Sequence, residues 1–241
     1  MIIAVILDES GSMNKIKYST IDGYNEFIEE RKDDLELTGK QLNKFVFIKF
    51  NSNVKYEIFH KIDDITPLND TNYSPSNMTS LYDAIGKSFE LIGDVKDEEI
   101  HIIIITDGLE NRSTEYSKDQ IQKLIVKYKQ YDNWNFIFCG ANQDSYLTTK
   151  AFGLDNRDTI INFETQNEAM PTLFRSISSQ VRKSTIPQRS KTENNLPINA
   201  DNKKLPAINT FQSENTGDEK LSQLKRPTLT RIDSSFRSHL S

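Results

Sequence analysis

Short runs of consecutive apolar residues alternate along the chain with longer segments in which apolar residues recur every three or four positions. The runs are typical of strands buried on both faces of a sheet, and the wider spacing is typical of amphipathic helices. Strands are predicted at Ile2–Leu7, Phe45–Phe50, Val54–Phe59, Ile100–Ile105, Phe136–Cys139 and Thr159–Phe163. Helices are predicted at Ile16–Lys32, Leu81–Leu91, Ile121–Tyr128, Tyr146–Phe152 and Leu173–Val181.

This order of elements indicates an α/β fold, because strands that alternate with helices build a parallel sheet covered on both faces. We predict a doubly wound, mostly parallel sheet of six strands. The second and third strands are separated only by Asn51, Ser52 and Asn53. So short a connection joins antiparallel neighbours, and this pair is therefore expected to form a hairpin at one edge of the sheet.

The chain changes character near Lys183. Residues 1–183 carry the regular apolar pattern and are predicted to form one domain. Residues 184–241 are rich in Ser, Asn and Pro and contain four of the seven prolines. Such a composition does not sustain a core, and we predict a disordered tail with only short transient helices.

Composition narrows the choice of partners and compartment. The net charge of −5 and a pI near 5.4 argue against nucleic acid as the main partner, since phosphate binding needs a basic face. The single cysteine, Cys139, excludes an intramolecular disulfide and suits a reducing compartment. No apolar stretch approaches the roughly 20 residues of a membrane span. We expect a soluble, cytoplasmic protein that does not bind membranes.

Two of the predicted strands end in an aspartate followed by turn residues. Asp8, Ser10 and Ser12 follow the first strand, and Asp107 follows the fourth. Ligands bind at the carboxyl ends of the strands in open parallel sheets, so both aspartates are expected on one rim. Alternate positions of a sharply turning loop, with Gly11 permitting the turn, direct one carboxylate and two hydroxyls at a common point. Such oxygen ligands favour Mg²⁺, with Mn²⁺ or Ca²⁺ as substitutes, and no His or Cys cluster favours zinc.

The segment Asp8-Glu9-Ser10-Gly11-Ser12 resembles the D-x-S-x-S motif of the von Willebrand factor A domain, and the resemblance extends over residues 1–183. Thr79 and Asp107 lie where that family places its metal-binding threonine and its second aspartate. The resemblance implies a metal-ion-dependent adhesion site of five residues. In it the hydroxyls contact the metal directly and the two aspartates act mostly through water. The site residues are Asp8, Ser10, Ser12, Thr79 and Asp107.

Two details qualify the resemblance. The family usually has glycine two residues before the threonine, where this chain has Asn77, a residue type that tolerates the left-handed backbone conformation. The segments 106–111 and 140–144 are further similar to a branch of the family found in bacteria, phages and large viruses.

Glu9 and Glu110 are interpreted as solvated rather than as supports of the site. Asn142 and Asp144 are interpreted as caps of the short helix.

The resemblance implies a divalent-metal-dependent protein–protein interaction module whose partner supplies an Asp or Glu to the metal, and not an enzyme. A second hypothesis is a Mg²⁺-dependent phosphoryl-transfer hydrolase, because haloacid dehalogenase-like phosphatases also begin at a strand-end aspartate. Those enzymes need a second carboxylate two residues later, where this chain has Ser10, and the chain has no phosphate-binding glycine loop. A third hypothesis is a scaffold whose metal site is vestigial and whose C-terminal tail is the working part. The alternative interpretation of the site residues is that Ser10 and Ser12 merely cap the first helix and that Asp107 satisfies local amides.

Overall fold

The computed structural model describes residues 1–141, 149–150, 152–154, 159–166 and 169–184. Most of the helix predicted at Tyr146–Phe152 lies outside these residues, as does the predicted disordered tail after Ser184. No helix among the described residues is both long and apolar enough to cross a membrane.

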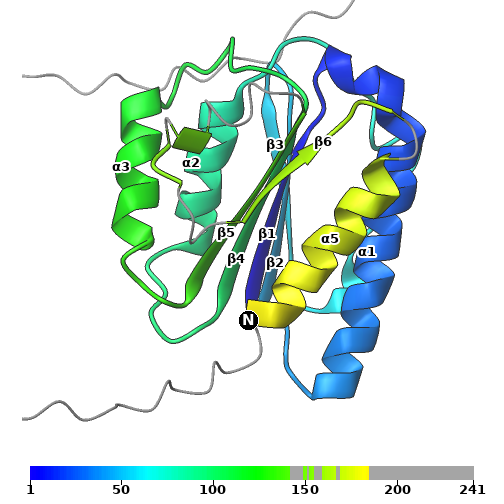
Figure 1. The fold of residues 1–241 in the computed structure, drawn as a ribbon, viewed down its shortest axis with the longest axis vertical. Helices are drawn as coiled ribbons and strands as arrows, with labels where there is room; N and C mark the ends of the chain where they lie inside the picture. The colour runs from blue at the N-terminus through cyan, green and yellow to red at the C-terminus, as the bar shows by residue number, and fades with distance from the viewer. Residues whose placement is uncertain (142–148, 151, 155–158, 167–168, 185–241) are drawn as a thin grey trace, which may run out of the picture. The chain divides into compact units, whose positions relative to one another are not determined.

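A single sheet of six strands organises the fold, in the order β3-β2-β1-β4-β5-β6 (Figure 1). All neighbouring pairs are parallel except β2 and β3, which form an antiparallel hairpin at the edge. The predicted fold class and the predicted edge hairpin are therefore confirmed. The strands are β1 (Ile2–Asp8), β2 (Lys44–Phe50), β3 (Val54–Phe59), β4 (Ile100–Thr106), β5 (Trp134–Ala141) and β6 (Thr159–Phe163).

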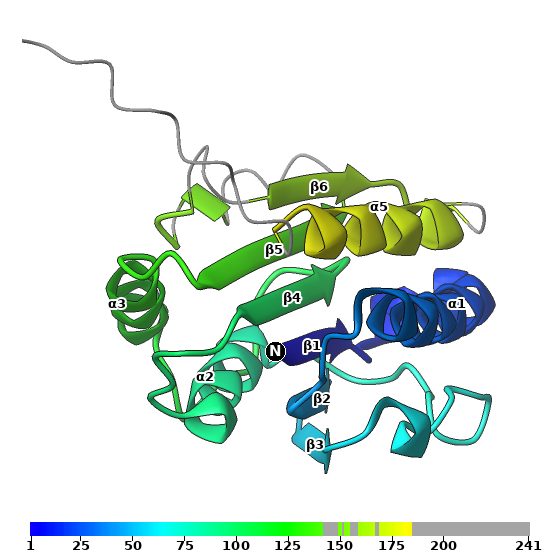
Figure 2. The same cartoon turned by 90° about the horizontal axis from the view of Figure 1, so that it is seen from below.

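Helices cover both faces of the sheet, with α1 and α5 on one face and α2 and α3 on the other (Figures 1 and 2). The helices are α1 (Lys17–Thr38), α2 (Leu81–Ile92), α3 (Lys118–Tyr128) and α5 (Ala169–Ser184), with 3-10 turns η1 (Gly11–Ile16) and η2 (Ile62–Asp64). The first helical segment is longer than predicted at both ends. It begins as η1 directly after the Asp8 loop and ends only at Gly39, whose φ of 65° stops the helix.

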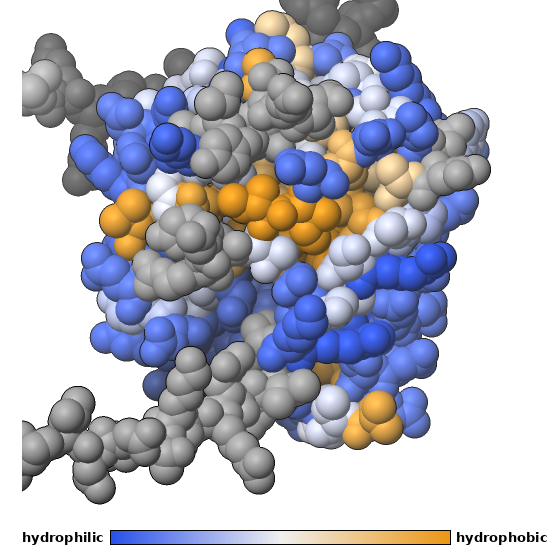
Figure 3. Space-filling view, in the orientation of Figure 1, coloured by the Kyte–Doolittle hydropathy of each residue, from blue (hydrophilic) through white to orange (hydrophobic). Residues whose placement is uncertain are grey.

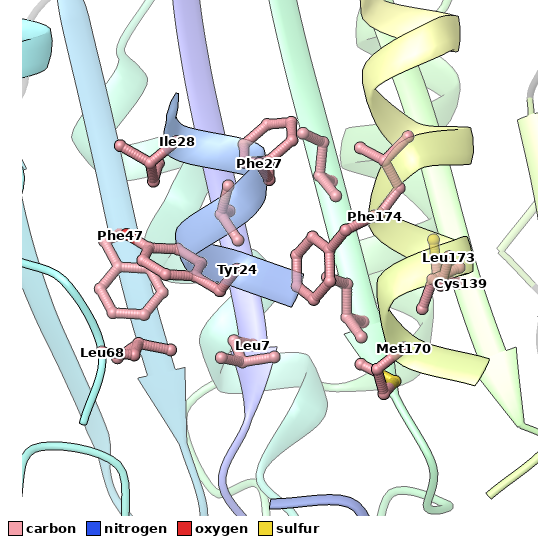
Figure 4. Close-up of a cluster of buried hydrophobic side chains, with 14 of the residues drawn as sticks. Leu7, Tyr24, Phe27, Ile28, Phe47, Leu68, Cys139, Met170, Leu173 and Phe174 are labelled. Atoms are coloured by element: carbon pink, nitrogen blue, oxygen red, sulfur yellow. The ribbon is translucent and has the colours of Figure 1, made fainter. Parts of the chain in front are cut away.

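Each side of the sheet has its own apolar core, because successive side chains of a strand point to opposite faces. In β1 the side chains of Ile3, Val5 and Leu7 pack under α1 and α5, and those of Ile2, Ala4 and Ile6 pack under α2 and α3. Figure 4 shows the first of these cores, where aromatic side chains of α1 and α5 meet over the strands. This double burial explains why the central strands β1 and β4 contain unbroken apolar runs, Ile2–Leu7 and Ile102–Ile105.

Polar side chains cover most of the outer surface of the helices in the view of Figure 3, and apolar side chains gather around β6. Trp134 is 6% exposed and stacks on Tyr128 with ring centroids 4.1 Å apart. Tyr82 is half-buried and packs edge-on against Phe152. Neither ring is free for recognition of a partner.

The strand order places a switch point between β1 and β4. The chain leaves β1 toward β2 and β3 on one side, and returns to the other side as β4. A crevice forms at the carboxyl ends of the strands where such an order reverses. Asp8 ends β1 and Thr106 ends β4, so the predicted site lies at this crevice.

Candidate metal centre

Asp8 lies at the centre of the rim and is fully buried. Its Oδ1 accepts a hydrogen bond from the Ser10 amide at 2.7 Å, and its Oδ2 accepts one from the Thr106 hydroxyl at 2.6 Å. The Tyr73 hydroxyl donates to the main-chain oxygen of Asp8 at 2.8 Å. These contacts hold the carboxylate and its strand end in one orientation. No ion pair of Asp8 occurs among the residues that the structure describes.

A chain of short contacts connects the loop after β1 to the loop after β4. The hydroxyl oxygens of Ser10 and Ser12 are 3.0 Å apart, and the Ser12 hydroxyl donates to Asp107 Oδ1 at 2.5 Å. Ser10 is buried, whereas Ser12 is exposed. The site therefore opens to solvent on the Ser12 side.

Gly108 marks the point at which the site oxygens converge. A Cβ added to this glycine would lie 3.3 Å from Thr79 Oγ1, 3.6 Å from Ser12 Oγ and 3.8 Å from Asp8 Oδ2. These three oxygens come from two separate loops, and the space between them is free only because residue 108 has no side chain. The structure thus brings all five predicted residues together, while the binding of a metal by them stays a prediction.

Asn77 adopts the left-handed conformation, with φ of 65°, and is the one residue other than glycine to do so in the described part of the chain. Its main-chain oxygen accepts a hydrogen bond from the Gly11 amide at 3.1 Å, which joins the threonine loop to the serine loop. Asparagine tolerates this left-handed conformation better than most residue types. Gly11, in contrast, is not in the left-handed region, and a Cβ added there would lie 3.4 Å from the Asn77 main-chain oxygen.

Asn111 holds Thr79 by two hydrogen bonds. The side-chain Oδ1 of Asn111 accepts a hydrogen bond from the Thr79 main-chain amide at 2.8 Å. The main-chain amide of Asn111 donates to the Thr79 main-chain oxygen at 3.1 Å. The threonine is consequently positioned by the loop that also carries Asp107. The sequence around Asn111 showed only a family resemblance, and this role of Asn111 was not predicted from it.

Glu9 and Glu110 are engaged with the main chain, so their interpretation as solvated residues is wrong. Glu9 is 5% exposed and accepts a hydrogen bond from the Ser74 amide at 2.8 Å. Glu110 accepts from the amide of Tyr82 at 3.0 Å, at the start of α2, and from the amide of Ser113 at 2.6 Å. A carboxylate at a helix N-terminus satisfies amides that have no partner within the helix. Both glutamates therefore support the loops that carry the site. Asn142 and Asp144 lie outside the described residues.

Burial controls the acidity of the two aspartates. It raises the pKa of Asp8 to about 6, although the hydrogen bonds from Thr106 and Ser10 act in the opposite direction and the charge of Asp107 adds a smaller increase. Burial also raises the pKa of Asp107, against the lowering effects of the Ser12 hydrogen bond and of Lys15. Two carboxyl groups so close together favour either protons or a cation between them.

The donor set fits a hard divalent cation. The three atoms nearest the space beside Gly108 are carboxylate or hydroxyl oxygens, and the buried Asp8 carboxylate there has no basic side chain as partner in the described chain. Among the same residues, no group of three or more His, Cys, Asp or Glu side chains is placed to hold a metal. A cation at this rim would therefore depend on the serine and threonine hydroxyls. The Ser10 side chain makes no capping hydrogen bond to η1, so it is not merely a helix cap.

No family model matches the chain, and no curated protein matches its sequence. Solved structures share its fold at low identity. The von Willebrand factor type A protein from Catenulispora acidiphila aligns with a TM-score of 0.51 and 12% identity, over 74% of this chain and 42% of that one. The vWF domain of the type V pili tip protein Mfa5 from Porphyromonas gingivalis aligns with a TM-score of 0.52 and 10% identity, over 80% and 97%.

Proximal thread matrix protein 1 from the mussel byssus aligns with a TM-score of 0.53 and 18% identity, over 74% of this chain and 47% of that one. The chain thus spans about half or less of the length of the mussel and Catenulispora proteins. At such identities the likeness concerns the fold alone. The chain has the fold of a von Willebrand factor A domain.

Proposed function

We propose that this protein is a divalent-metal-dependent interaction module that binds an acidic residue of a protein partner. The observation that carries the proposal is the convergence beside Gly108 of a buried carboxylate with hydroxyls from its own loop and from a second loop. Asp8 has no basic partner among the described residues, and a buried carboxylate without compensation is costly. A cation at the rim would supply that compensation.

Ser10, Ser12 and Thr79 are the residues that we assign as direct ligands, with Asp8 and Asp107 holding the metal mostly through water. Mg²⁺ is the favoured ion because the donors are all oxygen, and Mn²⁺ or Ca²⁺ could replace it. Neutral hydroxyls leave a bound cation with net positive charge, which an incoming carboxylate neutralises. Ser12 is the exposed member of the set, so the partner would approach from its side.

The comparisons support an interaction role rather than catalysis. The same fold occurs in a pili tip protein and in a thread matrix protein of the mussel byssus. The Ser10 and Ser12 hydroxyls contact each other, and Ser12 donates to the Asp107 carboxylate. Among the described residues, neither serine hydroxyl has a hydrogen bond to an imidazole. His60 and His101 lie at the end of the sheet that is away from the site. His60 follows the end of β3, which is antiparallel, and His101 is near the start of β4.

Metal binding is tested by calorimetry and by thermal unfolding of the full chain with Mg²⁺ or a chelator. One ion per chain should stabilise the fold by roughly 1.4 kcal/mol at ten times its Kd. Asp8→Ala and Ser10→Ala should abolish that response. Gly108→Ala should weaken Mg²⁺ binding about tenfold, because its methyl group occupies the space among the oxygens. A wild-type protein that binds no divalent ion at millimolar concentration would refute the proposal.

Gly11→Ala is the matched control for Gly108→Ala. Its added methyl group would contact the Asn77 main-chain oxygen at 3.4 Å, and no site oxygen is among its nearest neighbours. Mg²⁺ affinity should consequently stay within about twofold of wild type. Equal losses in the two variants would show that the loops are merely sensitive to bulk.

Partner binding is tested by affinity capture with Mg²⁺ and with chelator. Capture should need both the metal and one acidic residue of the partner. Thr79→Ala should weaken partner capture more than metal binding, since in the family this threonine contacts the metal when ligand engages, whereas Asp107→Ala should impair both. A partner captured equally well by the Asp8→Ala protein would favour the scaffold hypothesis, in which the metal site is vestigial.

A further inference from the structure

Among the residues that the structure describes, nothing pairs with the outer edge of strand β3, and this edge carries none of the five site residues. β3 is the outermost strand next to β2, and no other element lies beyond it in Figure 2. The four central residues of the strand are exposed, and two of them are large and apolar: Tyr56 is 50% exposed and Ile58 is 40% exposed. Unpaired main-chain groups beside exposed apolar side chains are a template for pairing with another strand.

The hairpin shows which main-chain groups of β3 point to this free edge. Phe50 pairs with Val54, and inside that pair the Asn51 amide donates to the Asn53 oxygen at 3.0 Å. Phe50 and Val54 are therefore a pair without mutual hydrogen bonds. Hydrogen-bonded and non-hydrogen-bonded pairs alternate along an antiparallel ladder, so the next pair along β3 is hydrogen-bonded to β2. The amides and carbonyls of Lys55 and Glu57 face β2. Those of Val54, Tyr56 and Ile58 face outward.

The outward-facing residues match a second copy of themselves. When two β3 strands pair antiparallel about a two-fold axis at Tyr56, Tyr56 lies opposite its own counterpart, and Val54 lies opposite Ile58 of the second copy. Every outward-facing residue is then in a hydrogen-bonded pair that exchanges both N–H···O=C bonds. The apolar side chains of all these residues lie on one face of the joined sheet, because side chains alternate along a strand.

The charges of β3 select the same register. Lys55 then lies opposite Glu57 of the second copy, and Glu57 lies opposite its Lys55, so that both cross-strand pairs are of opposite charge. Opposite charges across a ladder are favourable, and like charges are unfavourable. Among the described residues neither Lys55 nor Glu57 has an ion-pair partner within its own chain.

We propose that two copies of this chain associate through their β3 edges, in the register centred on Tyr56, and so join their sheets into one. Such an interface is isologous, because each copy contributes the same surface. It lies at an edge of the sheet that carries none of the five site residues. Association should therefore be the same with Mg²⁺ and with chelator.

A charge exchange tests the register by sedimentation of the full chain over a range of concentrations. Wild type should form a concentration-dependent dimer. Lys55→Glu places Glu opposite Glu in both pairs, and Glu57→Lys places Lys opposite Lys, so each variant should raise the dimer dissociation constant about tenfold or more. The double variant Lys55→Glu/Glu57→Lys restores opposite charges and should recover dimerisation. Both side chains are exposed in the single chain, so its fold should be unaffected.

Amide hydrogen exchange locates the interface independently. Exchange at Val54, Tyr56 and Ile58 should slow as the protein is concentrated. Exchange at Lys55 and Glu57 should stay constant, because β2 already protects those amides. A wild-type chain that stays monomeric at its highest soluble concentration would overturn the proposal. So would a dimer that tolerates both single variants, since its interface would then lie elsewhere.

Discussion

The two ends of the sheet differ in whether a buried charged side chain has a counter-charge beside it. At the amino end, Arg31 is 4% exposed and pairs with Asp34, which also accepts a hydrogen bond from Arg182 Nε at 2.7 Å. Arg182 in turn lies 3.7 Å from Glu30. These residues connect α1 to α5. At the carboxyl end, Asp8 is equally buried but is surrounded by hydroxyls and amides, without a basic partner in the described chain.

This difference indicates a structural role for the Arg31 end of the sheet and a binding role for the Asp8 end. The Arg31 cluster contains its own counter-charges, although burial still lowers the pKa of Arg31 and its Nε has no hydrogen-bond partner among the described residues. At the Asp8 rim, burial disfavours the charged form of the carboxylate, as its raised pKa of about 6 reflects. A buried charge that the chain leaves uncompensated is typical of binding and catalytic sites. The same substitution should therefore have opposite effects at the two ends.

The largest effect is expected for Asp8→Asn measured in chelator at pH 7. Removing the costly charge should raise the free energy of unfolding, by at most about 3 kcal/mol for a shift of this size. The Thr106 hydroxyl, which is also 3.1 Å from the Gly108 oxygen, can turn to donate there and accept from the new amide. Mg²⁺ binding should be lost at the same time.

Chemical denaturation of the variant, with the exposed Asp22→Asn as control, measures this change. A variant clearly less stable than wild type in chelator would show that the Asp8 charge is compensated inside the chain. The contrast between the two ends would then not hold.

A smaller effect of opposite sign is expected for Asp34→Asn. The substitution leaves Arg31 and Arg182 without their shared carboxylate and should lower the free energy of unfolding by about 2 kcal/mol. Breaking a fully buried pair costs more, but the Asp34 side chain is 20% exposed. The neighbouring Asp33→Asn, at an exposed position, should be within about 0.5 kcal/mol of wild type. Equal stabilities of the two variants in denaturation would mean that the cluster contributes nothing.

The smallest expected effect is on pH dependence. The folded pKa of Asp8 is raised from 3.8 to about 6, so its contribution to stability is fully present below pH 3.8 and is lost as pH rises through 6. Lowering the pH from 7 to 5 should stabilise metal-free wild type by about 1 kcal/mol relative to Asp8→Asn. The stabilisation that Mg²⁺ provides should decrease as the pH is lowered from 7 to 5, because protons compete with the metal for the carboxylate.

Thermal unfolding at pH 7 and at pH 5, with Mg²⁺ and with chelator, separates these two effects. An Mg²⁺-induced shift of the same size at both values would exclude Asp8 as the group that links proton and metal.

The sequence predicted the strands better than the helices. Each strand between two helix layers is a continuous apolar run, and β1, β2 and β4 accordingly begin and end within one or two residues of their predicted bounds. The first helix was misjudged because its ends depend on context. The turn η1 follows directly from the Asp8 loop, and the last turns of α1 pack Leu35 against the core. Local spacing carries neither signal.

The support of the site could not be predicted, since its contacts join distant parts of the chain. Glu9 meets the Ser74 amide across 65 residues, and Tyr73 meets the Asp8 oxygen across the same separation. A glutamate that satisfies a distant amide has the same local sequence as one in solvent. The burial of Asp8 is likewise the main cause of its raised pKa, and burial depends on the packing of distant segments.

By itself, the sequence determined the order of the elements and the chemistry of the rim, because apolar runs specify buried strands and a parallel sheet collects its strand ends at one edge. Only the tertiary structure decided that Thr79 lies beside Asp8 and that Gly108 leaves the space among their oxygens. In the part of the chain that it describes, the structure also leaves the β3 edge unpaired, with Lys55 and Glu57 exposed on it. The burial of a side chain, the convergence of the site oxygens and the free edge of a strand all depend on which segments pack together. That packing is a property of the whole fold rather than of any one segment.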